Sequence, residues 1–425
     1  MNNVKLPVRP SSYDKKVGLV LQGGGALGSY QAGVYEALAS SEYLPDWVAG
    51  ISIGAINAAL IAGNPPEHRV ERLRSFWEDI TAPTSWWPSD LPGPFAAWQQ
   101  NLSAHSALMF GQPGFFAPRN SFEWFSAEKP ISFYDTKALK STLERLVDFD
   151  RINSRKEMRL SVGAANVRTG SFTYFDSGEI SIRPEHVMAS GALPPGFPPV
   201  EIDGEHYWDG GLVSNTPLQY VLDYYPRRSR LTFQVDVFQA FGQLPKTLEE
   251  VSERLNDIRY SSRTRVNTDA FQQKHDVRHA INELEKLLPA EILETEQGKR
   301  LHAFGCVTEM DIVQLIYRPF VPQGEAKDYE FSRSTMNARW RQGLSDGAAT
   351  LQAAPWLAPK VNEDGVRVFD VMHAILLEQN PATAKARAED ADRPASQPVG
   401  PTKSTSQTVA PSRNQREIGQ TNGRP

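Results

Sequence analysis

The chain has 425 residues, 40% of them hydrophobic and 22% charged, which is enough for one large or two medium domains with a full core. Its net charge of −5 argues against a nucleic-acid partner, because nucleic-acid-binding chains are usually basic. Cys306 is the only cysteine, which excludes an intramolecular disulfide and a cysteine zinc site and fits a reducing compartment. The polar residues 1–14 lack the apolar run of a secretory signal, and the longest near-apolar stretch, 50–63, is too short to span a bilayer. We expect a cytoplasmic protein whose membrane contact is peripheral.

The first 80 residues alternate between strand-like and helix-like segments. Buried-strand patterns cover residues 17–21 and 47–51, and helical spacing of apolar residues covers 29–39, 55–62 and 67–80. This order favours a parallel sheet that is covered by helices on both faces. The sequence therefore predicts the α/β class.

Residues 82–130 have a different character, rich in proline, glycine and aromatic residues and without clear periodicity. One interpretation is an irregular insertion that packs on the domain. The other is a cap over an apolar acyl pocket, since long loops over active sites often act as lids. The residues leave both interpretations open.

The rest of the chain continues the mixed pattern. Helices are predicted at 135–147, 247–296, 329–349 and 368–377, a short proline-broken helix within 185–200, and strands at 158–166, 171–175, 231–238 and 311–317. The strands 158–166 and 171–175 should be antiparallel neighbours, and 201–211 should form a hairpin that turns at Asp203-Gly204. The charged helical stretch 247–296 indicates a solvated face. We expect residues 1–15 to be flexible, 246–379 to form a mostly helical C-terminal extension, and 380–425, which lack aromatics and leucine, to be a disordered tail.

The stretch Gly50-Ile-Ser52-Ile-Gly54 lies between a predicted strand and a predicted helix. This is the G-x-S-x-G pattern of a nucleophile elbow, in which the serine sits on a strained turn and the flanking glycines avoid clashes. The turn would hold the Ser52 hydroxyl at a helix N-terminus, where the helix dipole favours developing negative charge. Ser52 is therefore a candidate nucleophile.

A second glycine motif, Gly23-x-Gly25-x-x-Gly28, follows the first predicted strand and opens a helix. The spacing matches the dinucleotide-binding fingerprint, which also needs an acidic residue at the C-terminal end of the second strand. Asp46 and Glu42 lie at the wrong end of that strand, which argues against a nicotinamide cofactor. The alternative is that the N–H groups of Gly23, Gly24 and Gly25 form an oxyanion hole beside Ser52.

A serine nucleophile needs a base. None of the eight histidines follows an acidic residue in a strand-end loop, as an α/β-hydrolase triad would require. Asp209, in Trp208-Asp-Gly-Gly211, is the better candidate, because apolar neighbours would bury its carboxylate and raise its pKa. Gly210 and Gly211 would let the backbone pass close to the serine loop.

Four blocks together resemble the patatin-like phospholipases: the glycine motif 23–28, the elbow 50–54, the stretch Ala189-Ser-Gly-Ala-Leu-Pro-Pro-Gly-Phe-Pro-Pro-Val200 and Asp209-Gly-Gly211. They occur in the family's order within residues 16–245, which would form the hydrolase domain. The resemblance implies a three-layer α/β/α fold, a Ser52–Asp209 dyad without histidine, and an oxyanion hole lined by residues 23–25. It further implies hydrolysis of acyl esters in lipids at a membrane or micelle surface, without metal or cofactor. The supporting glycines would be Gly28, Gly50, Gly54, Gly210 and Gly211.

One position departs from the family pattern. The glycine motif usually has Arg or Lys before its last glycine, where this chain has Leu27. The missing cation favours, as an alternative, a catalytically weak lipid-binding or scaffold protein on the same fold, and it argues against a preference for charged head groups. A conventional Ser–His–acid esterase is the third hypothesis. The extension after residue 275 resembles one that follows some bacterial patatin-like domains.

Overall fold

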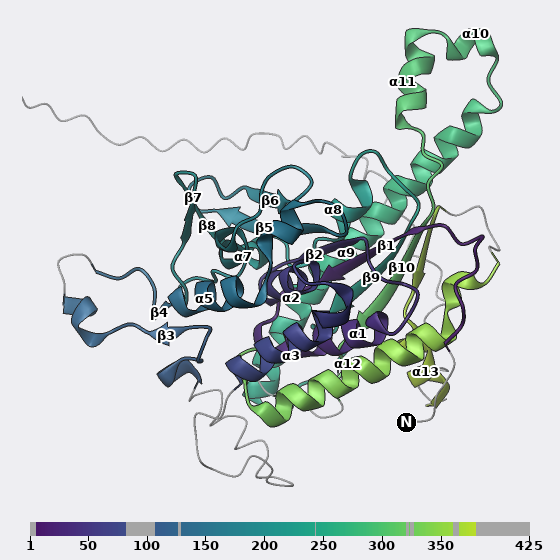
Figure 1. The fold of residues 1–425 in the computed structure, drawn as a ribbon. Coiled ribbons are helices and arrows are strands. Elements are labelled where there is room, and N and C mark those ends of the chain that lie inside the picture. Colours follow the sequence, from purple (N-terminus) through teal and green to yellow (C-terminus); the bar gives the residue numbers. More distant parts are fainter. Residues whose placement is uncertain are drawn as a thin grey trace, which may run out of the picture. The chain divides into compact units, whose positions relative to one another are not determined.

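The structure, a computed structural model, describes residues 6–81, 107–125, 129–242, 244–319, 323, 327–359 and 365–379. Its centre is a nine-stranded sheet with the order β11-β10-β9-β1-β2-β5-β8-β7, in which β6 also pairs with β5 (Figure 1). The strands of this sheet are β1 (Lys16–Leu21), β2 (Trp47–Gly50), β5 (Arg159–Asn166), β6 (Phe172–Asp176), β7 (Val200–Ile202), β8 (Glu205–Asp209), β9 (Arg230–Asp236), β10 (Met310–Ile316) and β11 (Val366–Phe369). The strands β3 (Ala117–Pro118) and β4 (Tyr134–Asp135) pair separately.

The strands from β11 to β5 run parallel, and β6, β7 and β8 add an antiparallel end to the sheet. Parallel neighbours need crossover connections, which the helices provide. The longer helices are α1 (Gly28–Ala39), α2 (Ile53–Ala62), α3 (Arg69–Ile80), α5 (Lys137–Leu146), α7 (Pro184–Ser190), α8 (Leu218–Asp223), α9 (Leu248–Glu285), α11 (Glu296–Phe304), α12 (Arg333–Ala353) and α13 (Val371–Gln379). Short helical segments are η1 (Gly25–Leu27), η2 (Pro66–His68), η3 (Ser121–Phe125), α6 (Phe149–Asn153), η4 (Gly210–Leu212), α10 (Ala290–Leu293) and η5 (Pro355–Leu357).

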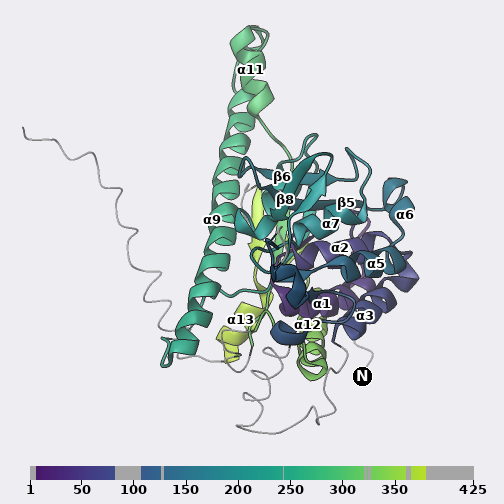
Figure 2. The ribbon, with the colours of Figure 1, turned by 90° about the vertical axis from the view of Figure 1, so that its left-hand side faces the viewer.

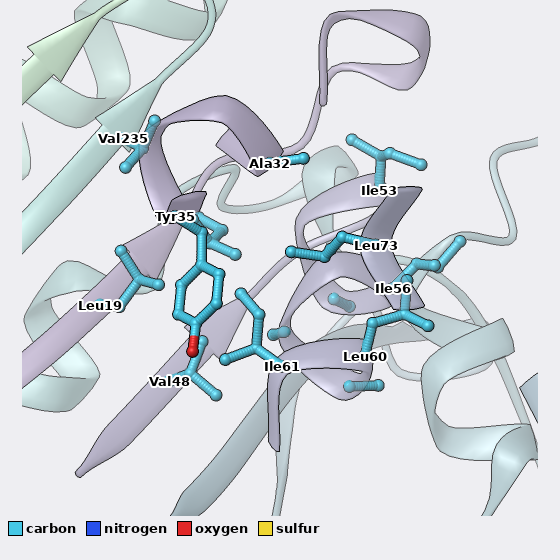
Figure 3. Close-up of a cluster of buried hydrophobic side chains, with 14 of the residues drawn as sticks. Leu19, Ala32, Tyr35, Val48, Ile53, Ile56, Leu60, Ile61, Leu73 and Val235 are labelled. Atoms are coloured by element: carbon cyan, nitrogen blue, oxygen red, sulfur yellow. The ribbon is translucent and has the colours of Figure 1, made fainter. Parts of the chain in front are cut away.

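Alternate residues of the central strands bury themselves in two different clusters, as a sheet covered on both faces requires. Leu19 of β1 and Val48 of β2 point to one face, where Tyr35 of α1 and Ile61 of α2 join them (Figure 3). The helices α3, α5, α7 and α12 contribute further residues to this cluster. These contacts place α1, which follows the glycine motif 23–28, and α2, which follows the elbow, directly on the sheet.

The opposite face is covered by α8 and α9. Val20 of β1 packs there with Leu222 of α8, Phe271 of α9 and Ile312 of β10. Figure 2 shows α9 running along this side, with α11 at its far end. The predicted α/β class with layers of helices on both sides of a mostly parallel sheet is therefore confirmed.

The C-terminal part of the chain is mostly helical, as expected, but it also completes the central sheet. β10 pairs with β9, and β11 pairs with β10. Helix α12 runs alongside α1 (Figure 1), and the two backbones approach so closely at Gly33 and Gly343 that a Cβ atom at either position would collide with the other helix. Residues through Ile375 belong to one compact unit, and the boundary at residue 245 stays a prediction.

The structure differs from the predicted elements at the C-terminal end. The helix predicted at 368–377 is wrong at its start, because Val368 and Phe369 lie in β11 beside Ile312 and Val313 and only from Val371 does the chain become helical. The helix predicted from residue 329 begins at Arg333, where the Ser332 hydroxyl caps it by accepting the N–H of Thr335 at 3.3 Å. Residues 82–106 and the predicted tail 380–425 lie outside the described residues.

The N-terminal segment up to residue 15, predicted to be flexible, makes specific contacts from residue 9 onward. Arg9 donates to the Tyr13 and Lys15 carbonyls, and both the Tyr13 hydroxyl and the Lys15 ammonium bind Asp311 of β10 at 2.7 Å. Arg367 of β11 pairs with the same carboxylate at 2.8 Å. These cations hold the pKa of Asp311 below its usual value although burial opposes the shift.

Candidate active site

Ser52 occupies the sharp turn between β2 and α2, in the strand–turn–helix context that the sequence predicts. Its backbone has φ 55° and ψ −125°, a strained conformation for a residue with a side chain. The Ser52 N–H donates to the carbonyl and to the hydroxyl of Ser190, both at 3.1 Å, and the Ser190 hydroxyl donates to the Gly163 carbonyl at 2.6 Å. The C-terminal end of α7 and the adjacent strand β5 thus hold the turn that presents Ser52.

Asp209 reaches Ser52 from the end of β8. This strand pairs with β5, which in turn pairs with β2, so the sheet brings together two residues that are far apart in the sequence. The Asp209 carboxylate is buried and accepts a hydrogen bond from the Ser52 hydroxyl and one from the Gly211 N–H at 2.7 Å. Burial raises the pKa of Asp209 to about 6, and the two hydrogen bonds oppose that rise. The carboxylate is therefore a stronger base than an exposed aspartate.

The glycine loop, residues 23–25, follows β1 and lines the same pocket as Ser52 and Asp209. Asn215 makes two hydrogen bonds with Gly23, the first residue of the loop. The Gly23 N–H donates to the Asn215 backbone carbonyl at 3.1 Å, and the Asn215 side chain donates to the Gly23 carbonyl at 3.0 Å. The Gly23 N–H is thus engaged, in contrast to the expectation that it faces an oxyanion. Gly24 and Gly25 remain as candidate donors.

The other side of the glycine loop is held by the C-terminal part of the chain. The Ala26 N–H donates to the Asp328 carbonyl at 2.8 Å. Gly25 has φ +55°, and a Cβ atom at this position would collide with the same carbonyl oxygen. Only glycine combines this left-handed backbone with so close an approach.

The supporting glycines lie where the sequence predicts close contacts around the site. A Cβ atom at any of them would come within 3 Å of a neighbouring atom. The neighbours are Ile53 for Gly28, the Gly54 carbonyl for Gly50, the Leu21 carbonyl for Gly54, the Gly163 carbonyl for Gly210 and the Asn215 side chain for Gly211.

The pocket around Ser52 is walled mainly by aliphatic and aromatic side chains. They come from α2, from the segment after residue 107, from the stretch after α7, from the loop after β9, from α9 and from the turn before α12: Ile53, Ile56, Phe115, Phe116, Leu193, Phe197, Phe238, Tyr260, Tyr329 and Phe331. Phe116 packs its ring against those of Phe197 and Phe331, with ring centroids 5.2 and 6.5 Å apart. Part of the aromatic-rich segment therefore forms a wall of the pocket.

No lysine or arginine lines the pocket among the described residues, and its charged groups are Asp209 and Asp328. Leu27, which replaces the family's cation, is fully buried in the core cluster with α1 and does not line the pocket. Leu27 therefore fills the core, and the described walls around Ser52 carry no cation.

Histidines do not contribute to this site in the part of the chain that the structure describes, and His105 lies outside that part. His186, the buried histidine on α7, accepts the Arg183 N–H at 2.8 Å and packs against the Phe175 ring. Burial lowers its pKa to about 4. Within the same described residues, no group of three or more His, Cys, Asp or Glu side chains could hold a metal ion.

Sequence reasoning missed three residues that shape the site: Ser190 behind the elbow, and Asn215 and Asp328 on either side of the glycine loop. Ser190 lies in the family-like stretch 189–200, but its hydroxyl matters here because it joins the Ser52 turn to Gly163 of β5. Asn215 and Asp328 carry no local pattern that distinguishes them from other polar residues.

Two family models match the chain. One, described as patatin-like phospholipase, matches residues 19–222, and the other, described as patatin phospholipase, matches residues 258–363. Together the matched segments make up more than half of the 425 residues. The chain belongs to the patatin-like phospholipase family. All of the predicted site residues lie in the first matched segment, and Asp328 lies in the second.

Individual relatives of this patatin-like chain are distant. It is 30% identical over 205 residues to the patatin-like phospholipase domain-containing protein ZK370.4 of Caenorhabditis elegans, a match that covers 47% of this chain and 12% of that protein. Among solved structures, VipD from Legionella pneumophila aligns with 14% identity and a TM-score of 0.33 over 89% of this chain and 74% of its own. Human GIVD cytosolic phospholipase A2 aligns with 12% identity and a TM-score of 0.33, covering 81% and 60% of the two chains.

Proposed function

We propose that the chain is a lipid acyl hydrolase in which Ser52 is the nucleophile and Asp209 the general base. The observation that carries this proposal is the hydrogen bond between the strained elbow serine and a buried carboxylate whose pKa is raised to about 6. Covalent catalysis needs a nucleophile that is hydrogen-bonded to a base of suitable pKa.

In the reaction we envisage, Asp209 takes the proton of the Ser52 hydroxyl as its oxygen attacks the ester carbonyl carbon. The electrons of the C=O double bond move to the oxygen, and the N–H groups of Gly24 and Gly25 and the N-terminus of α2 stabilise its charge. The tetrahedral intermediate then expels the alcohol, which takes the proton back from Asp209. A water molecule, deprotonated by Asp209, cleaves the acyl-enzyme to release the carboxylic acid and restore Ser52.

The walls of the pocket support a lipid as the substrate. Aromatic and aliphatic side chains surround Ser52 and would bury an acyl chain, at roughly 0.8 kcal/mol for each buried CH₂ group. Because the described walls carry no cation, we propose that binding depends on the acyl chain more than on an anionic head group. Phospholipids and related acyl esters both fit this description.

The decisive experiment compares Ser52→Ala and Asp209→Asn with the unchanged protein. Each should lower the turnover of p-nitrophenyl esters by on the order of 10⁴-fold while the protein stays folded, and a fluorophosphonate probe should label the parent protein at Ser52. Ser154→Ala, at an exposed serine outside the pocket, should leave both readouts unchanged.

Near-normal turnover of Asp209→Asn would refute the dyad. A folded parent protein that neither turns over esters nor reacts with the probe would indicate a lipid-binding scaffold. A loss of activity in a single His→Ala variant would instead reveal a Ser–His–acid esterase.

We also propose that the substrate is reached at a membrane or micelle surface. Large apolar side chains are exposed on the segment that supplies Phe115 and Phe116 to the pocket: Leu108, Met109, Phe110, Phe122, Trp124, Phe125, Ile131 and Phe133. Phe122 and Phe125 are 83% and 88% exposed. Monomeric soluble proteins rarely expose large apolar patches unless these bind a partner or a membrane. Among the described residues, no helix is long and apolar enough to cross a membrane, so this surface would bind at the interface.

A vesicle-binding measurement tests the surface separately from the chemistry. The double variant Phe122→Asp/Phe125→Asp should lose at least tenfold in affinity for phosphatidylcholine vesicles and keep its turnover of a short water-soluble ester. Leu287→Asp changes an equally exposed leucine near the far end of α9 and should leave vesicle binding unchanged. Equal vesicle binding by the double variant would refute this surface.

A further inference from the structure

The turn formed by residues 327–331 belongs to the C-terminal part of the chain, yet it forms one side of the pocket. Asp328, Tyr329 and Phe331 line the pocket beside Ser52. The Asp328 carbonyl accepts the Ala26 N–H at 2.8 Å and lies against Gly25. The position of this carbonyl therefore sets how the glycine loop is oriented.

Lys327 anchors the turn to α9 through a buried ionic cluster. Its ammonium lies 2.7 Å from the Asp257 carboxylate and 3.2 Å from that of Glu253, and all three side chains are at most 9% exposed. Both carboxylates lie one turn apart on the first part of α9, so together they fix the ammonium in place.

Helix α12 holds the same turn from its backbone. The Arg339 guanidinium, itself buried, donates to the Lys327 carbonyl at 2.8 Å and to the Glu330 carbonyl at 3.2 Å. The turn is thus fixed on two sides before it reaches the glycine loop. The Lys327 side chain itself points to α9 and does not line the pocket, so it would not contact a substrate there.

A buried ionic cluster is an expensive way to stabilise a fold, because its desolvation offsets most of the attraction between the charges. Its benefit here is geometric: an ammonium held by two carboxylates has one defined position. An oxyanion hole needs such definition, since displacements of about 0.5 Å at catalytic donors already reduce catalysis.

We propose that Lys327 is a positioning residue for the oxyanion hole. Its ion pairs with Glu253 and Asp257 fix the Asp328 carbonyl, and this carbonyl fixes the Ala26 N–H and with it the orientation of the Gly24 and Gly25 N–H groups. The inference rests on the proposed hydrolase function and adds that the C-terminal part of the chain takes part in building its catalytic site.

The test removes the charges without leaving one of them unpaired. The triple variant Lys327→Met/Glu253→Gln/Asp257→Asn keeps the side-chain volumes and should fold with a Tm close to that of the parent protein. We expect its kcat for a p-nitrophenyl ester to fall 10- to 100-fold while KM changes less than twofold, and its rate of fluorophosphonate labelling to fall in parallel. The single variant Lys327→Arg, which keeps the positive charge, should retain most of the kcat of the parent protein.

Lys286→Met is the matched control, because Lys286 follows α9 and pairs with Glu283 on the exposed surface; its kcat should not change. A folded triple variant with the parent's kcat would overturn the positioning role, as would a loss confined to Tm. If the triple variant does not fold, Lys327→Met is compared with Lys327→Arg under the same assay, and equal kcat values of the two overturn it. A parent protein that is itself inactive and unlabelled would refute the proposed function, which separates that failure from this one.

Discussion

The elbow of Ser52 and the glycine loop line the same pocket, but they are held in different ways. Among the described residues, the hydrogen bonds and close backbone contacts that fix the elbow come from within the first matched segment: Ser190, Gly163 and the flanking glycines. The glycine loop is held on one side by Asn215 and on the other by Asp328, which belongs to the second segment. The segment that carries all of the recognisable motifs therefore supplies only part of the support that its own site needs.

This difference has a physical basis. The turn of the elbow is itself local, a strained residue between a strand end and a helix start, and Ser190 and Gly163 support it from other elements. The contact of Asp328 with the glycine loop joins residues that are far apart in sequence, so it depends on the packing of α9 and α12, which hold the turn 327–331. Changes at the elbow should act on the nucleophile and its base, and changes at the loop should act on the stabilisation of the oxyanion.

After the loss of Ser52 or Asp209 themselves, the largest effect should come from Gly25→Ala. A methyl group would collide with the Asp328 carbonyl oxygen and would also be strained at φ +55°, so the loop must move away from this support. Because the loss of one oxyanion-hole donor costs about 10²- to 10³-fold in kcat, we expect a decrease of that size with KM little changed. Steady-state kinetics on a p-nitrophenyl ester would measure it.

Gly170→Ala provides the control for backbone strain alone. Gly170 has φ +68° in the turn between β5 and β6, and a Cβ atom there would meet nothing within 4 Å. This variant should be slightly less stable and fully active. If Gly25→Ala were as active as Gly170→Ala, the loop would not depend on the Asp328 contact.

A tenfold effect is expected from pH, and it arises at the elbow. The proposed base, Asp209, can take a proton only when it is ionised, and burial raises its pKa to about 6. The value of kcat/KM should therefore be constant above about pH 7 and fall about tenfold per pH unit below 6. The profile of the Gly25→Ala variant should keep the same midpoint, because the loop does not contact the carboxylate. A midpoint near 4, the value of an exposed aspartate, would contradict the assigned base.

How far the sequence predicts this molecule follows the same division. The proximity of Ser52 and Asp209 could be predicted because each lies in a short recognisable pattern, although it is the pairing of β2, β5 and β8 that brings them together; their catalytic roles stay a prediction. The helix predicted at 368–377 wrongly includes Val368 and Phe369 of β11, because a short strand followed by an apolar run fits either period. Asn215, Asp328 and Lys327 could not be predicted, since their roles depend on which distant backbone they meet. The engagement of the Gly23 N–H by Asn215 is likewise visible only in three dimensions.

Ser190→Ala should have a smaller effect than the pH change and should act on the elbow. The hydroxyl links the Ser52 N–H to the Gly163 carbonyl, while the Ser190 carbonyl keeps its own bond to the Ser52 N–H. Losing a buried hydrogen bond of about 1 kcal/mol should reduce kcat severalfold. Kinetics together with a thermal melt would separate the two contributions. A lower Tm with unchanged kcat would show that Ser190 supports only the fold.

The smallest effect concerns stability and distinguishes Asp209 from an ordinary buried aspartate. Its pKa is raised in the folded protein, so the folded state binds this proton more tightly than the unfolded chain does. The stability that Asp209 contributes is thus fully present below about pH 4 and is lost as the pH rises through 6. Asp209→Asn keeps a side-chain oxygen that can accept the Gly211 N–H, but it cannot ionise. We expect it to raise Tm by about 1–3 °C at pH 8 and by less at pH 5, as measured by differential scanning calorimetry. Asp269→Asn, at an exposed position of α9, should show no such pH dependence. A Tm that is lowered at pH 8 would mean that the ionised carboxylate stabilises the elbow, because its hydrogen bonds with Ser52 and Gly211 then outweigh the unfavourable free energy of its burial.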